Sequence, residues 1–144
     1  MAHDILHRVG IDAPLGKVFE TLTTLEGHQR WWDSGAKGDA SKGGTLTFFK
    51  NFDFQVVETK PGELVKWKCV RGAEEWLGTE ISFALARRKD QTFVLFKHAG
   101  WKEPVEFMYH CSTKWATFLL SLKALLETGK GRPAPGEVQI EVGG

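Results

Sequence analysis

The stretch of residues 110–129, HCSTKWATFLLSLKALLETG, is the feature that most constrains the fold. At about 100° per residue, its apolar side chains fall on one stripe of a helix. The stripe consists of Cys111, Trp115, Phe118, Leu119, Leu122, Leu125 and Leu126. The opposite face is predicted to carry Thr117, Ser121, Ala124 and Thr128. Gly129 suits the left-handed position that ends a helix, and Pro133 and Pro135 prevent its resumption.

Strand-like segments fill most of the chain before this helix. Residues 3–11 alternate apolar and polar side chains, which predicts a half-buried strand with His7 pointing inward. Five further strands are predicted at residues 45–50, 52–59, 64–70, 78–87 and 92–98. Because the turns between them are short, these strands are expected to form an antiparallel meander. A long one-sided helix needs a large apolar partner, and this sheet is the only candidate.

Two short helices are expected between the first strand and the meander. Asp12 and Pro14 mark the start of the first helix, and Thr23 or Thr24 offers a cap for the second. Residues 33–44 are small, polar and Gly-rich, which predicts a loop of functional or mobile character. This loop lacks the Gly-Lys-Ser/Thr ending of a phosphate-binding loop and precedes a strand, so that interpretation is rejected.

Composition indicates one ordinary globular domain and excludes several classes of partner. The chain has 144 residues and a formal net charge of +1, so no electrostatic argument favours nucleic acid or an acidic membrane surface. No apolar run approaches the roughly 20 residues of a membrane span. The N-terminus carries charges where a signal peptide is apolar, so a cytoplasmic location is expected. Cys69 and Cys111 form no metal spacing and give no argument for a disulfide, and neither a metal nor a cofactor is predicted.

The aromatic content is unusual for a chain of this size. Six Trp and ten Phe supply more ring volume than a small core ordinarily requires. Two interpretations stay open: bulky core residues with some exposed Trp, or a pocket lined by aromatic side chains.

The order of these predicted elements and several local motifs resemble a known superfamily. The motifs are residues 9–14 with Val18-Phe19, residues 23–32, 64–67, 78–83, 92–100 and 115–126. Together they resemble the α+β helix-grip fold of the START and pollen-allergen-like superfamily, also called SRPBCC. The most similar branch is that of homologues of the activator of the heat-shock-protein-90 ATPase. The expected domain spans residues 1–131, followed by a Gly/Pro-rich tail at 132–144; residues 137–142 form a short strand or, preferably, remain disordered.

The resemblance implies a curved antiparallel sheet around the long helix, with a cavity between them that binds apolar molecules. The residues predicted to line it are Trp31, Trp32, Phe48, Phe54, Trp67, Trp76, Phe83, Phe96, His98, Trp101, Trp115, Phe118 and Leu122. The favoured function is therefore the binding of a small hydrophobic or aromatic ligand, oriented by a few polar groups including His98.

Two other classes of function stay open. The first is a cyclase- or hydrolase-like enzyme acting on a polyketide-type substrate, with His98 as a weak candidate for acid/base catalysis. The second is a chaperone-interaction module or homodimer that uses its outer surface, for which exposed Trp31, Trp32 or Trp76 would supply anchors.

Overall fold

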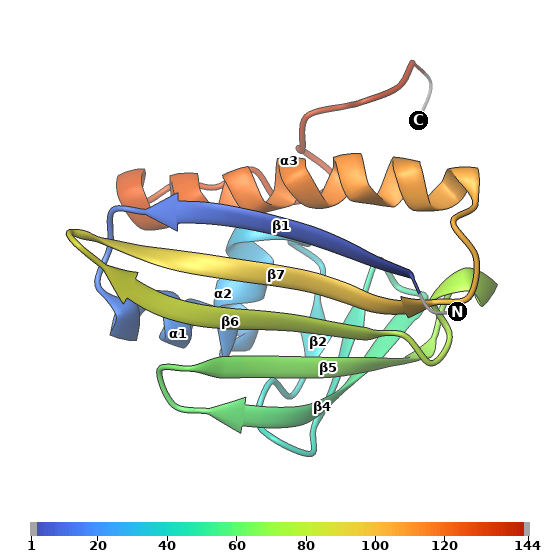
Figure 1. Cartoon of the computed structure of the whole chain (residues 1–144), viewed down its shortest axis with the longest axis horizontal. Helices are drawn as coiled ribbons and strands as arrows, with labels where there is room; N and C mark the ends of the chain where they lie inside the picture. Colours follow the sequence, from blue (N-terminus) through green and yellow to red (C-terminus); the bar gives the residue numbers. More distant parts are fainter. Residues whose placement is uncertain (1–2, 143–144) are drawn as a thin grey trace.

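The computed structural model describes residues 3–142 and contains one seven-stranded antiparallel sheet in the order β1-β7-β6-β5-β4-β3-β2 (Figure 1). The strands are β1 (His3–Ile11), β2 (Lys37–Gly38), β3 (Thr45–Phe48), β4 (Phe52–Lys60), β5 (Leu64–Arg71), β6 (Glu80–Arg88) and β7 (Gln91–Trp101). Consecutive strands from β2 to β7 are neighbours, so the predicted meander is confirmed. The first strand, β1, pairs with β7 and forms one edge of the sheet, where Val9 lies opposite Val94.

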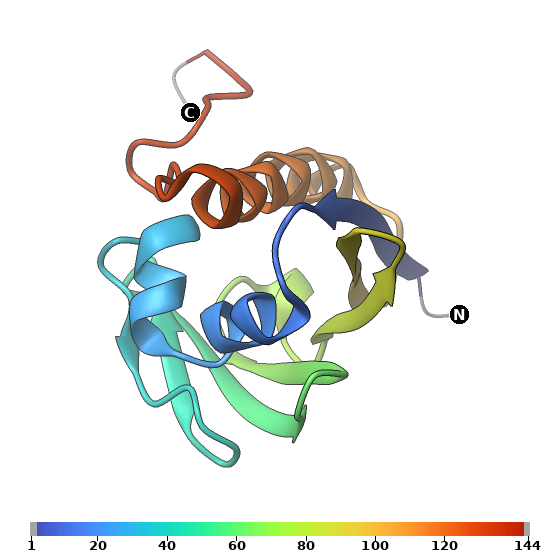
Figure 2. The same ribbon diagram turned by 90° about the vertical axis from the view of Figure 1, so that its left-hand side faces the viewer.

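Three α-helices complete the α+β helix-grip architecture that the sequence predicted. They are α1 (Leu15–Leu22), α2 (Leu25–Trp31) and the long α3 (Glu106–Thr128). The sheet curls, α3 lies across its open side, and α1 and α2 close one end (Figure 2). No side chain fits at Gly27, because a Cβ there would collide with the Thr21 carbonyl, so this glycine allows α1 and α2 to approach closely.

Strand periodicity sends alternate side chains into the space beneath α3. In β7, Thr92, Val94, Phe96 and His98 are buried, whereas Leu95 and Lys97 are exposed on the outer face. The same alternation in β6 buries Ile81 and Phe83. The inner face of the sheet and the apolar stripe of α3 therefore share one core.

Several predictions of local structure were wrong. The long helix begins at Glu106 rather than at residue 110, and the acidic side chain of Glu106 suits the first turn of a helix. The 33–44 loop contains β2, which pairs with Leu46 and Thr47 and adds an edge strand. Between the predicted strands at residues 64–70 and 78–87, a short 3₁₀ helix, η1 (Glu74–Trp76), forms that the pattern did not predict.

The helix caps were predicted in part. Thr24 accepts a hydrogen bond from the Gly27 amide and caps α2, as expected. Asp12 does not cap α1, because Pro14 occupies the N-cap position and no side chain caps this helix; the Asp12 backbone N–H donates to Glu127 on α3. Gly129 has a φ of 87° and ends α3 in the left-handed conformation, as predicted.

Ser121 was predicted on the exposed face of the long helix but is buried. Its hydroxyl donates to the Trp31 carbonyl at 2.8 Å and accepts from the Arg132 amide at 2.7 Å. The prediction failed because α2 and the chain leaving α3 cover this side of the helix, which the periodicity of one helix does not reveal. The Ser121 hydroxyl satisfies two backbone groups where these segments meet.

The tail after α3 is anchored before it reaches its last described residues. Ala134 is buried, its amide donates to the Trp32 carbonyl at 2.8 Å, and its carbonyl accepts from the Ser34 amide at 3.0 Å. Residues 137–142 contain no strand and follow an irregular path held by side-chain contacts.

We expect Ser121→Ala to lower the free energy of unfolding by about 1–3 kcal/mol, because two backbone groups lose their hydrogen-bond partner. Urea denaturation measures this change. Thr113→Ala is the matched control, since the exposed Thr113 hydroxyl bonds only to the Tyr109 carbonyl of its own helix. Equal losses in the two variants would contradict the role assigned to Ser121.

Candidate functional site

The space beneath α3 is largely filled by aromatic rings. Trp32 is at the centre: its ring centroid lies 4.0 Å from Phe48, 4.9 Å from Trp115 and 5.9 Å from Trp67. Trp31 stacks on Trp32 at 5.7 Å. Such offset and tilted contacts pack at the density of a protein interior, so the middle of the domain is solid.

His98 belongs to this solid core. It is fully buried, with Nδ1 accepting from the Trp115 indole N–H at 3.1 Å and Nε2 lying 2.8 Å from the Thr79 hydroxyl. Since the Thr79 hydroxyl donates to the Trp76 carbonyl at 2.6 Å, Nε2 carries the proton and donates to Thr79. Both ring nitrogens are occupied, and burial lowers the pKa of His98 to about 3. This environment suits a neutral structural residue rather than a proton carrier at neutral pH.

His28 repeats the arrangement on the other side of the core. Its Nδ1 accepts from the Trp31 indole N–H at 3.2 Å, and its Nε2 lies 3.1 Å from the Leu22 carbonyl. Burial lowers the pKa of His28 to about 3, partly offset by the hydrogen bond to Leu22. The domain therefore holds two neutral histidines, each of which accepts an indole N–H.

An open pocket of about 180 Å³ lies at the edge of this core, between α3 and the β3–β4 hairpin. Its aromatic walls are Trp32, Phe49, Phe52, Trp76, Phe107, Trp115 and Phe118. The remaining lining residues are His110, Cys111, Lys114 and Glu137. Trp76 and Trp115 stack nearly parallel at 6.1 Å, while Phe52 meets Trp76 edge-on at 5.0 Å. These flat apolar surfaces suit the faces and edges of another ring.

Asp33 fixes one wall of the pocket. This carboxylate is buried at the end of α2 and accepts from the Phe49 amide at 2.7 Å and from the Gly35 amide at 3.1 Å. Phe49 has a positive φ of 52°, which is uncommon for a residue other than glycine. The hydrogen bond from its amide therefore helps to hold the β3–β4 turn where Phe49 reaches the pocket.

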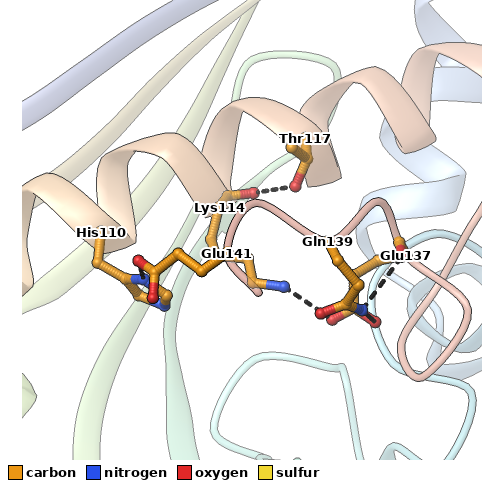
Figure 3. A network of polar contacts seen from close by, with 6 residues as sticks. All are labelled: His110, Lys114, Thr117, Glu137, Gln139 and Glu141. Atoms are coloured by element: carbon orange, nitrogen blue, oxygen red, sulfur yellow. Dashed lines mark hydrogen bonds and ion pairs between the residues drawn. The ribbon is translucent and has the colours of Figure 1, made fainter. Parts of the chain in front are cut away.

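The rim of the pocket is polar and is shared with the tail. Lys114 Nζ lies 3.2 Å from a carboxylate oxygen of Glu137, and His110 Nδ1 lies 2.7 Å from one of Glu141 (Figure 3). The Lys114 and Glu137 side chains are only 18% and 13% exposed, so this pair is more sheltered than the one between His110 and Glu141. Lys114 Nζ also lies 5.8 Å from the centre of the Phe118 ring.

The thiol in the pocket is inert. Burial raises the pKa of Cys111 to about 12, although a contact with the Trp76 side chain opposes this shift. The Trp76 indole N–H has no hydrogen-bond partner of normal geometry among the described residues. A thiol with such a pKa is not a nucleophile at neutral pH. Within residues 3–142, no group of three or more His, Cys, Asp or Glu side chains is placed to hold a metal ion.

The structure separates the predicted ligand-binding residues into two groups. Four of them line the pocket: Trp32, Trp76, Trp115 and Phe118. The others do not line it and are buried elsewhere in the core: Trp31, Phe48, Phe54, Trp67, Phe83, Phe96, His98, Trp101 and Leu122.

Sequence reasoning missed the remaining lining residues. Phe107, Cys111 and Lys114 lie on the helix face that also carries the predicted Phe118, but the predicted helix began too late to include Phe107. Phe49 and Phe52 flank the predicted turn at residues 50–51, where their meeting with α3 is a tertiary contact. No local pattern in the sequence predicts the contact between Glu137 and Lys114.

Comparisons with known proteins agree with this architecture. The family model described as "Activator of Hsp90 ATPase homolog 1-like protein" matches residues 12–127. A solution structure of the Aha1 dimer from Colwellia psychrerythraea is 45% identical, with a TM-score of 0.81, and the match covers 90% of this chain and 99% of that one. No curated protein matches the sequence at a significant level.

More distant structures share the fold alone. CalU16 from Micromonospora echinospora has 23% identity and a TM-score of 0.75, and the match covers 93% of this chain and 78% of that one. DynU16, described as a protein of the dynemicin biosynthetic locus, has 20% identity and a TM-score of 0.73, covering 89% of this chain and 48% of that one. In the described part of the chain, no helix is long and apolar enough to cross a membrane.

The two buried histidines should make the protein sensitive to acid. Their pKa is lower in the folded than in the unfolded chain, so unfolding takes up protons and the free energy of unfolding falls as the pH drops from about 6.5 towards 3. In the middle of this window each histidine contributes a slope of about 1.4 kcal/mol per pH unit.

We expect His98→Gln to reduce the slope of the free energy of unfolding against pH by the contribution of one histidine, about 1.4 kcal/mol per pH unit. Urea unfolding at a series of pH values measures this slope. The slope is informative even if the variant is less stable overall. Thr113→Ala, which replaces no titratable group, is the control and should leave the slope unchanged. A slope in His98→Gln equal to that of the parent would contradict the assignment.

Proposed function

The chain belongs to the family of activator of Hsp90 ATPase homolog 1-like proteins, and from this premise we propose that it binds a small apolar molecule containing one aromatic ring. The binding site is the pocket between α3 and the β3–β4 hairpin. The observation that carries the proposal is a pocket of about 180 Å³ with predominantly aromatic walls beside an otherwise filled core.

The size of the pocket sets the size of the ligand. In a different protein, a cavity of about 150 Å³ lined by apolar side chains stays dry and takes up benzene. A polycyclic molecule of polyketide type exceeds the volume observed and would require the tail or Phe49 to move. Burial of a single ring supplies modest affinity, from about millimolar to high micromolar dissociation constants.

The chemistry of the lining favours binding over turnover. His98 lies outside the pocket with both nitrogens hydrogen-bonded, and the pKa of Cys111 is raised to about 12. The charged groups at the rim, Lys114 and Glu137, neutralise each other. We therefore assign no catalytic residue to the pocket.

Self-association is a second candidate function, favoured by one specific observation. The relative from Colwellia psychrerythraea, which is 45% identical, is described as a dimer. The tryptophans considered as outer anchors do not support a surface role, because Trp31, Trp32 and Trp76 are buried. A dimer of this chain would therefore use other residues.

We expect toluene to bind to the pocket and to shift the NMR signals of Trp76, Trp115 and Phe118. Cys111→Phe should weaken this binding at least about tenfold, because the added ring occupies the same space. Leu120→Phe is the matched control on the exposed side of α3. Toluene binding of equal strength in the two variants would remove the pocket as the site.

Sedimentation equilibrium tests the second candidate. We expect a species of twice the 16.2 kDa monomer mass. A constant monomer mass across the accessible concentration range would exclude self-association as a function of the isolated chain.

A further inference from the structure

Lys114 is the only lysine or arginine that lines the aromatic pocket among the described residues. Its side chain is 18% exposed, and its ammonium lies near the face of Phe118. A sheltered cation is costly unless an anion accompanies it. The pocket is therefore built to hold one negative charge at its rim.

The tail supplies that charge in this structure. Glu137 reaches Lys114 from a segment without regular structure, and the two side chains point toward each other (Figure 3). The Glu137 carboxylate also lines the pocket, so its position is open to an occupant of the aromatic space.

The contacts that hold residues 137–142 are chiefly polar. Besides the Lys114 pair, they include the contact between His110 Nδ1 and the Glu141 carboxylate and hydrogen bonds from Gln139 to Glu137 itself. Val138 and Val142 are exposed. The more exposed contact between His110 and Glu141 contributes at most about 1 kcal/mol, and a ligand carboxylate that replaces Glu137 leaves the Lys114 ammonium paired, so this segment is exchangeable at low cost.

We infer that the ligand of the pocket is a small aromatic carboxylate, and that Glu137 occupies the position of the ligand carboxylate when the ligand is absent. The ring lies against the walls formed by Trp76, Trp115 and Phe118, and the carboxylate replaces Glu137 on Lys114. This inference rests on the proposed function, because it specifies the chemistry of the ligand in the same pocket. The tail then acts as an internal competitor.

Benzoate and the isosteric, neutral benzamide test the inference, and toluene reports on the pocket itself. In the unmodified protein, benzoate and benzamide should bind with similar strength, since benzoate must displace Glu137. In Glu137→Gln, we expect the preference for benzoate over benzamide to rise about tenfold. Calorimetry or NMR titration of the full chain measures the affinities, each divided by the toluene affinity of the same variant.

Two further variants complete the experiment. Glu141→Gln removes an equal charge from the same tail at the His110 pair and should not change the preference. The double variant Lys114→Met/Glu137→Gln removes the cation without leaving a lone sheltered charge, and the benzoate preference should disappear.

The outcomes separate the two proposals. Failure of toluene, benzamide and benzoate to bind overturns the proposed function. Binding of toluene with no gain for benzoate in Glu137→Gln overturns the carboxylate inference alone. An equal gain in Glu141→Gln also overturns it, because the overall charge of the tail would then control binding.

Discussion

Packing of aromatic rings around Trp32 is the interaction on which the domain depends. Trp32 follows the last residue of α2 and contacts rings from β3, β5 and α3: Phe48, Trp67 and Trp115. Each of these elements is anchored to the others through one side chain. These rings join the sheet, α2 and α3 in one closely packed core.

The same packing explains why the pocket lies at the edge of the fold. His28 and His98 accept the indole N–H groups of Trp31 and Trp115 while remaining neutral, whereas the buried indole N–H groups of Trp67, Trp76 and Trp101 have no hydrogen-bond partner among the described residues. Beside a centre filled in this way, the aromatic pocket lies between α3 and the β3–β4 hairpin. The walls of this pocket are aromatic, and its rim contacts solvent and the tail. A polar side chain can therefore lie beside an apolar space.

The sequence predicted the fold well because its periodic patterns are local. The alternation in β7 and the stripe on α3 depend on neighbouring residues, and both were confirmed. The burial of Ser121 depends on how α2 and the tail pack against a third element, and the periodicity of α3 contains no information about them.

The candidate site was less predictable than the fold, because it depends on contacts between segments that are distant in the sequence. Trp76, Trp115 and Phe118 were identified as pocket residues because they are aromatic and the fold places them inward. His98 was chosen for its chemistry, yet its surroundings make it a structural acceptor. The pairing of Lys114 with Glu137 joins two segments whose approach is set by the anchor at Ala134, which no local pattern encodes.

That anchor has a quantitative consequence for any molecule that enters the pocket. Ala134 is fixed to the chain beside Trp32 and Ser34, and Glu137 follows it closely in sequence. An extended chain of this length reaches only about 10 Å, so the carboxylate stays close to Lys114 even when it is released. A short tether of this kind corresponds to an effective concentration of about millimolar or more. A ligand carboxylate must compete with this local concentration, so occupancy of the pocket requires a correspondingly higher ligand concentration.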